Sequence, residues 1–202
     1  MKISRELILV KGFRFGGVNI GLKNESLDFG GIVANSPCSA AALFTKNNFP
    51  GAPVIVGREH VADGKLQAIV VNSKNANVAT GVAGIEVSRN TCRWLGEELN
   101  ISPVMILPSS TGVIGRPLDT TKIRTGCKIL ANQLGGDIEF SARFAKAIMT
   151  TDHHPKFAHI VLKDGTKILG IAKGAGMVEP NMATMLSYII TDGDLQSKEL
   201  RT

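Results

Sequence analysis

The sequence is poor in the residues that mark several common classes of protein. Its 202 residues include only three cysteines, Cys38, Cys92 and Cys127, and no C-x-x-C pair. This spacing predicts neither a disulfide framework nor a zinc site, so we expect ordinary buried thiols. Aromatic residues make up 5% of the chain, and the basic residues behind its net charge of +6 are scattered. Nucleic-acid-binding surfaces need clustered basic and aromatic side chains, so we expect no nucleic-acid partner.

Long apolar runs are also missing. Runs such as Ala68–Val71 and Val104–Leu107 are far shorter than the roughly 20 residues that a membrane helix needs. Lys11 follows the first apolar run too closely for a secretory signal peptide. From the sequence we therefore expect a cytoplasmic protein without a membrane partner.

The common catalytic motifs do not occur. The sequence has no G-x-S-x-G, no G-x-x-x-x-G-K-[ST] and no H-E-x-x-H. The glycines after Lys173 do not form a dinucleotide loop, because Glu179 replaces the third glycine and Pro180 would interrupt the helix. His153, His154 and His159 cluster at spacings that fit no zinc pattern. We therefore expect no metal and no cofactor, and an activity that needs few residues.

What is present is typical of one globular domain over residues 1–202. Hydrophobic residues make up 44% of the chain and charged residues 20%, which suits a buried core. Short apolar runs alternate with helical periodicity, so the fold class is predicted to be α+β. The expected strands are 53–56, 67–72, 103–108, 158–163, 167–172 and one near 185–191. The expected helices are 84–99, one that begins after Asp119 as N-cap and ends at Gly135-Gly136, and 138–148.

Six segments resemble, in order, the ornithine acetyltransferases (glutamate N-acetyltransferases) of arginine biosynthesis. They are KGFRFGGVNIGLK (11–23), ALFTKNNFPGAPV (42–54), VVNSKNANVATG (70–81), PSSTGVIGRPL (108–118), AIMTTD (147–152) and KGAGMVEPNMATML (173–186). The third segment departs from the family at Lys74, where a glycine is more usual. Because six motifs agree in order from Lys11 to Asp192, the chain is identified as a member of this family.

The resemblance implies a self-cleaving enzyme with a threonine nucleophile. The cut would fall between Ala183 and Thr184, which divides the chain into an α piece (1–183) and the start of a β piece (184–202). The hydroxyl of Thr184 would take the acetyl group of N-acetylornithine and pass it to glutamate, and the new α-amine of Thr184 would act as its base. Thr111 and the N–H of Gly112 would stabilise the oxyanion.

The family also implies the substrate site and the assembly. Thr150 and Lys173 would bind substrate together with Thr184, and the fold would be a layered α/β/β/α sandwich resembling N-terminal-nucleophile enzymes. Family members form α2β2 heterotetramers, and acetyl-CoA stays open as a second substrate. Family members are also much longer than this chain.

The residues leave alternatives open. Ser109–Gly112 also fits a polar turn after a strand, and Lys173 also fits a solvated lysine at a strand end. The chain itself could be a catalytically incomplete fragment of the acetyltransferase, or a related self-processing amidase or aminopeptidase.

Overall fold

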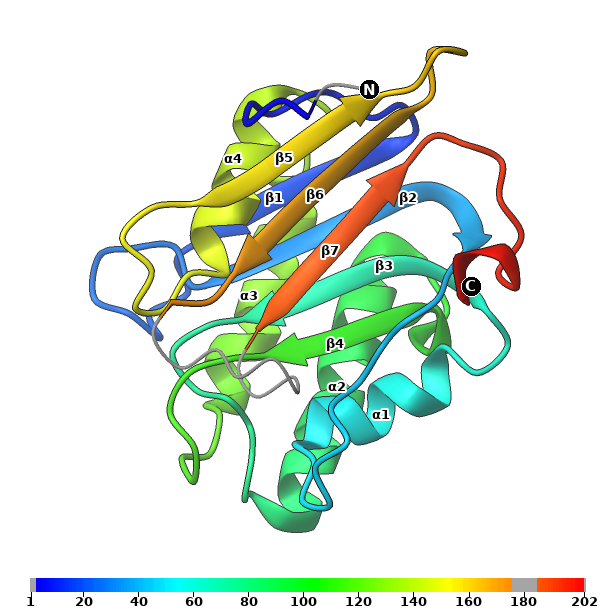
Figure 1. Ribbon diagram of the computed structural model, residues 1–202. Coiled ribbons are helices and arrows are strands. Elements are labelled where there is room, and N and C mark those ends of the chain that lie inside the picture. Colours follow the sequence, from blue (N-terminus) through cyan, green and yellow to red (C-terminus); the bar gives the residue numbers. More distant parts are fainter. Residues whose placement is uncertain (1–2, 176–184, 202) are drawn as a thin grey trace.

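A computed structural model describes residues 3–175 and 185–201 of the chain. In this part of the chain two β-sheets stack on each other, and helices cover the first sheet (Figure 1). The mixed α+β class predicted from the sequence is therefore confirmed. No helix in the described residues is long and apolar enough to cross a membrane.

The first sheet has four strands in the order β1-β2-β3-β4. The strands are β1 (Phe13–Val18), β2 (Phe29–Ser39), β3 (Lys65–Asn72) and β4 (Ile106–Ser110). β1, β2 and β3 pair antiparallel, whereas β3 and β4 are parallel and are connected through a helix. Parallel pairing places the carboxyl ends of β3 and β4 at the same edge of the sheet, and the loops after both strands therefore start side by side.

The second sheet is an antiparallel meander, β5-β6-β7, made of β5 (Lys156–Val161), β6 (Lys167–Lys173) and β7 (Leu186–Thr191). Asp164 and Gly165 form the turn between β5 and β6, as predicted. Gly165 has φ 88°, and Asp164 Oδ1 accepts the N–H of Thr166 at 3.0 Å. A glycine at this turn avoids the steric cost of a positive φ.

The four α-helices are α1 (Ala52–His60), α2 (Gly81–Leu99), α3 (Thr120–Ala131) and α4 (Ile138–Ala147), and the short 3₁₀ helices are η1 (Pro103–Met105) and η2 (Glu199–Arg201). Asp119 is the N-cap of α3, as predicted, and its Oδ1 accepts the N–H of Lys122 at 3.1 Å. The helices predicted at 84–99 and 138–148 match α2 and α4 closely. α3 ends four residues before Gly135, earlier than predicted.

Alternation along the strands of the first sheet separates two cores. Val70 points to the face that α2 and α3 cover, where it packs near Leu95 and Leu130. Val71 points to the opposite face and belongs to a second core with Phe144 of α4 and residues of the second sheet. Successive side chains of a strand point to opposite faces, which is why two adjacent valines serve different cores.

Glycines in β1 and β2 let helices approach the sheet on both faces. A Cβ on Gly17 would lie 2.3 Å from the carbonyl oxygen of Arg143 in α4, and one on Gly31 would lie 3.0 Å from Leu130 of α3. Gly17 pairs with Gly30 in the ladder between β1 and β2. The sequence analysis did not predict these two strands, because glycine inside a strand weakens the strand pattern.

Two predicted strands need correction. Residues 53–56 lie in α1, whose N-cap is Gly51 and whose first turn contains Pro53. Short apolar runs fit a strand or a buried helix equally well, and proline favours the first turn of a helix. Pro103–Met105 forms η1, and the strand begins only at Ile106.

Candidate active site

Three of the residues predicted for the site meet at one point. Lys173 is the last residue of β6, and its Nζ donates hydrogen bonds to Thr111 Oγ1 at 3.1 Å and to Thr150 Oγ1 at 2.7 Å. Thr111 directly follows β4, and Thr150 lies just after the end of α4. We call these three residues the lysine–threonine cluster. They come from segments far apart in the sequence, so only the packing of the two sheets brings them together.

Lys173 is not a solvated lysine at a strand end, because only 4% of its surface is exposed. Burial lowers the pKa of its ammonium group, while the Asp152 carboxylate raises it and Lys156 lowers it further. An ammonium group has three donors and no acceptor. Two of them go to Thr111 and Thr150, and the third has no partner among residues 3–175 and 185–201.

The ammonium of Lys173 also fixes how the two threonine hydroxyls can bond. Each hydroxyl must accept a hydrogen bond from Lys173, which leaves its own O–H able to donate elsewhere. Thr111 is 5% exposed, so its hydroxyl is held in a largely desolvated place. A donor held in this way suits a group on which negative charge develops during a reaction.

Gly112 sits where no other residue would fit without a shift of the backbone. Its φ is 129°, and a Cβ would lie 2.1 Å from the carbonyl oxygen of Lys74. That carbonyl accepts the N–H of Val113 at 2.8 Å, and Asn75 forms a parallel bridge with Val113. In the described part of the chain the N–H of Gly112 has no acceptor. The loops after β3 and β4 are thus paired with each other. The N–H of Gly112, next to Thr111, takes no part in this pairing.

Asp152, which was not predicted as a site residue, holds the backbone on both sides of the lysine–threonine cluster. Its Oδ1 accepts Lys156 Nζ at 2.6 Å and the N–H of Gly174 at 2.8 Å, and its Oδ2 accepts the N–H of Thr150 at 3.1 Å. Burial raises the pKa of Asp152, but these hydrogen bonds outweigh it and lower the pKa to about 2. The signal was present, because Asp152 ends the segment 147–152 and stands four residues before Lys156.

Lys23 is a second lysine that the sequence analysis did not single out. Its Nζ donates to the carbonyl oxygens of Leu27 at 2.9 Å and of Met149 at 2.7 Å, next to Thr150. Asp28 is fully buried and accepts the N–H groups of Ile20 and Lys23. The pKa of Lys23 is lowered, mainly by burial, against the opposing effect of Asp28. Lys23 therefore ties the segment 19–28 to the end of α4.

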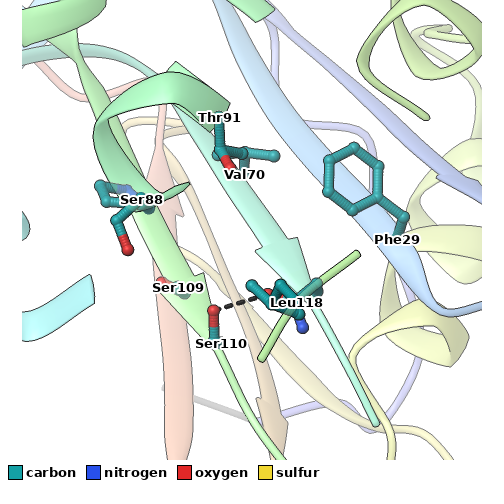
Figure 2. A pocket seen from close by; sticks show the side chains of 9 residues that line it. Phe29, Val70, Ser88, Thr91, Ser109, Ser110 and Leu118 are labelled. Carbon is teal, nitrogen blue, oxygen red and sulfur yellow. Dashed lines mark hydrogen bonds between the residues drawn. The ribbon is translucent and has the colours of Figure 1, made fainter. Parts of the chain in front are cut away.

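A small cavity lies beside β4, the strand that ends just before Thr111 (Figure 2). Its lining comes mainly from the first sheet and α2, and consists of Phe29, Val70, Asn72, Ser88, Thr91, Pro108, Ser109, Ser110 and Leu118. At its edge Ser110 Oγ donates to Asn72 Oδ1 at 2.5 Å, and the carbonyl oxygen of Asn72 accepts the N–H of Thr111 at 3.0 Å. Asn72 thus holds the ends of β3 and β4 together. The segment 109–112 was also considered as a polar turn. Ser109 and Ser110 belong to β4, and only Thr111 and Gly112 lie outside the strand.

The predicted cut site, Ala183 and Thr184, lies outside the described residues. The strands on either side are described, and Lys173 of β6 pairs with Leu186 of β7. Within residues 3–175 and 185–201, no group of three histidine, cysteine, aspartate or glutamate side chains is placed to hold a metal ion.

Known proteins resemble the chain in both sequence and structure. Residues 14–202 match the model of the ArgJ family. The arginine biosynthesis bifunctional protein ArgJ 2 of Clostridium acetobutylicum is 46% identical over 195 residues, which cover 96% of this chain and 49% of that protein. ArgJ of Staphylococcus aureus (strain Mu50) is 43% identical over 197 residues, 94% of this chain and 46% of that protein. The chain therefore spans about half the length of the curated relatives it matches.

Two crystal structures have the same fold. ArgJ of Bacillus halodurans has a TM-score of 0.82 and 35% identity, and the match covers 90% of this chain and 98% of that one. Ornithine acetyltransferase of Mycobacterium tuberculosis, solved in complex with ornithine, has a TM-score of 0.85 and 30% identity, with 92% and 99% covered. These matches confirm the family resemblance read from the six motifs.

Proposed function

Because the chain belongs to the ArgJ family, we propose that it is the nucleophile-bearing part of an acetyltransferase that moves an acetyl group from N-acetylornithine to glutamate. The observation that carries this proposal is the lysine–threonine cluster, in which a buried ammonium group holds two threonine hydroxyls beside the N–H of Gly112. Acyl transfer needs such fixed donors, because the carbonyl oxygen gains negative charge when it is attacked.

We assign the nucleophile to Thr184, released by a cut after Ala183. The Thr184 hydroxyl attacks the carbonyl of Ala183, and water opens the resulting ester to leave Thr184 with a free α-amine. The described residues support this assignment, because Leu186, two positions after Thr184 in the sequence, pairs with Lys173 of the lysine–threonine cluster.

The lengths of the solved chains support the cut as well. About nine-tenths of this chain covers nearly all of each solved chain, although it covers only about half of each curated relative. The solved chains are thus close in length to residues 1–183, the piece that precedes the proposed cut.

The transfer then proceeds in two half-reactions. The Thr184 hydroxyl attacks the acetyl carbonyl of N-acetylornithine, its proton passes by way of the α-amine to the departing nitrogen, and ornithine leaves. The amine of glutamate next attacks the acetyl ester, and N-acetylglutamate leaves as the Thr184 hydroxyl is restored. An α-amine has an unperturbed pKa of about 7.7–8.0, so near neutral pH it can both accept and return a proton.

We assign oxyanion stabilisation to Thr111 and Gly112, and substrate binding to Thr150 and Lys173. The third N–H of Lys173 suits a carboxylate of the amino-acid substrate. Because the relatives are about twice as long, we propose this activity for the chain together with the region that the relatives have beyond it. An α2β2 assembly, a cytoplasmic location and the absence of a cofactor belong to the same proposal.

Intact-mass measurement of the purified chain tests the cut. Loss of residues 184–202 from the main polypeptide is expected, and Thr184→Ala should abolish that loss. Thr184→Ser keeps a hydroxyl and should still cleave, and Thr166→Ala, in the exposed hairpin, should cleave like the parent. Cleavage that persists in Thr184→Ala would remove Thr184 from the mechanism.

Transfer of acetyl from N-acetylornithine to glutamate tests the reaction itself. The chain is assayed alone and co-expressed with the second half of the Clostridium acetobutylicum relative, with acetyl-CoA as an alternative donor in parallel. Activity that appears only with the second half favours the incomplete-fragment alternative for the chain alone, which its half-length match supports. Hydrolysis of the acetyl donor without transfer to glutamate would instead identify an amidase.

A further inference from the structure

Lys74 is a lysine in a backbone conformation that favours glycine. Its φ is 92°, and its carbonyl oxygen receives the N–H of Val113 in the loop beside Gly112. A residue with a Cβ pays a steric cost for such a conformation, which a glycine avoids. The Lys74 side chain is exposed and donates no hydrogen bond within residues 3–175 and 185–201, so no described contact of that side chain offsets this cost.

The charges around Lys74 are unbalanced. Lys23 and Lys173 lie at the same site, and both Lys74 and Lys173 oppose the charging of Lys23 and lower its pKa. Among residues 3–175 and 185–201, the two carboxylates that act on Lys23 are already occupied, because Asp28 accepts two backbone N–H groups and Asp152 accepts Lys156 together with two backbone N–H groups. Within residues 3–175 and 185–201, Lys74 is the exposed member of this group of lysines, and no described carboxylate pairs with its charge.

Building on the function proposed above, we propose that Lys74 is a specificity-determining residue that makes the site favour an amino acid with two carboxylates over a diamino acid. An exposed cation at a site attracts anionic ligands and repels cationic ones, and the effect decreases as salt screens it. In the proposed reaction, Lys74 would strengthen the binding of glutamate and weaken the binding of ornithine.

Two substitutions separate the charge of Lys74 from its backbone. Lys74→Gln keeps a Cβ in the left-handed conformation but removes the charge, whereas Lys74→Gly removes both the charge and the strain. Asn100→Gly is the matched control, because Asn100 also has a positive φ (55°) but lies at the end of α2, outside this site.

The test is calorimetric titration of the full chain and its variants, each co-expressed and purified with the second half of the Clostridium acetobutylicum relative, with L-glutamate and with L-ornithine, in 20 mM and in 300 mM NaCl. In low salt, Lys74→Gln and Lys74→Gly should each weaken glutamate binding about two- to fivefold and tighten ornithine binding by a similar factor, as expected for an exposed charge. The difference should shrink in high salt. Asn100→Gly should bind both ligands like the parent chain.

The outcomes distinguish this inference from the function on which it rests. If the parent chain binds glutamate and Lys74→Gln leaves the glutamate-to-ornithine preference unchanged, the inference fails and the proposed function stands. If the parent complex binds neither amino acid, the proposed substrate assignment fails, and the inference fails with it. A change seen in Lys74→Gly but not in Lys74→Gln would assign the effect to the backbone and would also overturn the inference.

Discussion

Replacing Asp152 with asparagine should destabilise the protein in a pH-dependent way. The Asp152 side chain is 1% exposed, and its two oxygens accept hydrogen bonds from Lys156, Gly174 and Thr150. Asparagine has nearly the same size, but it carries no charge and only one of its two terminal atoms can accept. The substitution therefore leaves at least one of these half-buried donors without its partner.

The pKa of Asp152 gives the magnitude and the sign. The folded state lowers this pKa from 3.8 to about 2, and such a shift corresponds to at most about 2 kcal/mol of stability. Because the folded pKa lies below the unfolded one, the contribution is fully present above about pH 4. It is lost as the pH falls from about 4 toward 2. Asp152→Asn should therefore lower the free energy of unfolding by about 2 kcal/mol at pH 6–7, with a smaller difference at pH 3.

Urea denaturation at pH 7, 5, 4 and 3, followed by circular dichroism, measures this difference. Asp164→Asn is the matched control: Asp164 also accepts a backbone N–H, from Thr166, but it lies in an exposed turn. The control should change stability much less at every pH. A difference between parent and Asp152→Asn that stays constant down to pH 3 would show that the Asp152 charge does not stabilise the fold.

Two further predictions concern Gly112 and the cysteines. Gly112→Ala combines a positive φ with a Cβ 2.1 Å from the Lys74 carbonyl oxygen. It should therefore lower both the thermal midpoint of unfolding and the transfer rate. A variant equal to the parent in both measurements would show that the loop does not need glycine. Cys92 and Cys127 are fully buried, and burial raises the pKa of both thiols, that of Cys92 to about 12. A thiol reagent at pH 8 should therefore modify only the half-buried Cys38 in the folded chain, and all three cysteines in guanidinium. Mass spectrometry counts the modified sites. Rapid labelling of Cys92 or Cys127 in the folded chain would contradict their burial.

Local chemistry in the sequence is sufficient for the elements that depend on neighbouring residues. Helical spacing and the Asp119 cap predict α2 and the start of α3, and Asp164-Gly165 predicts the turn of the β5–β6 hairpin. These features are local because a helix period, a cap or a tight turn involves residues only a few positions apart. The six ordered motifs also determine the family, and they include every residue of the lysine–threonine cluster.

Only the tertiary structure decides what depends on distant contacts. Residues 53–56 form a helix and the glycine-rich segments form β1 and β2, because packing settles patterns that are locally ambiguous. The burial of Lys173 and its contacts with Thr111 and Thr150 arise where strands of two sheets end beside each other. Asp152 acquires its role from the same packing, since its partners come from the ends of α4 and β6. The sequence thus names the residues of the lysine–threonine cluster, and the fold brings them within hydrogen-bonding distance.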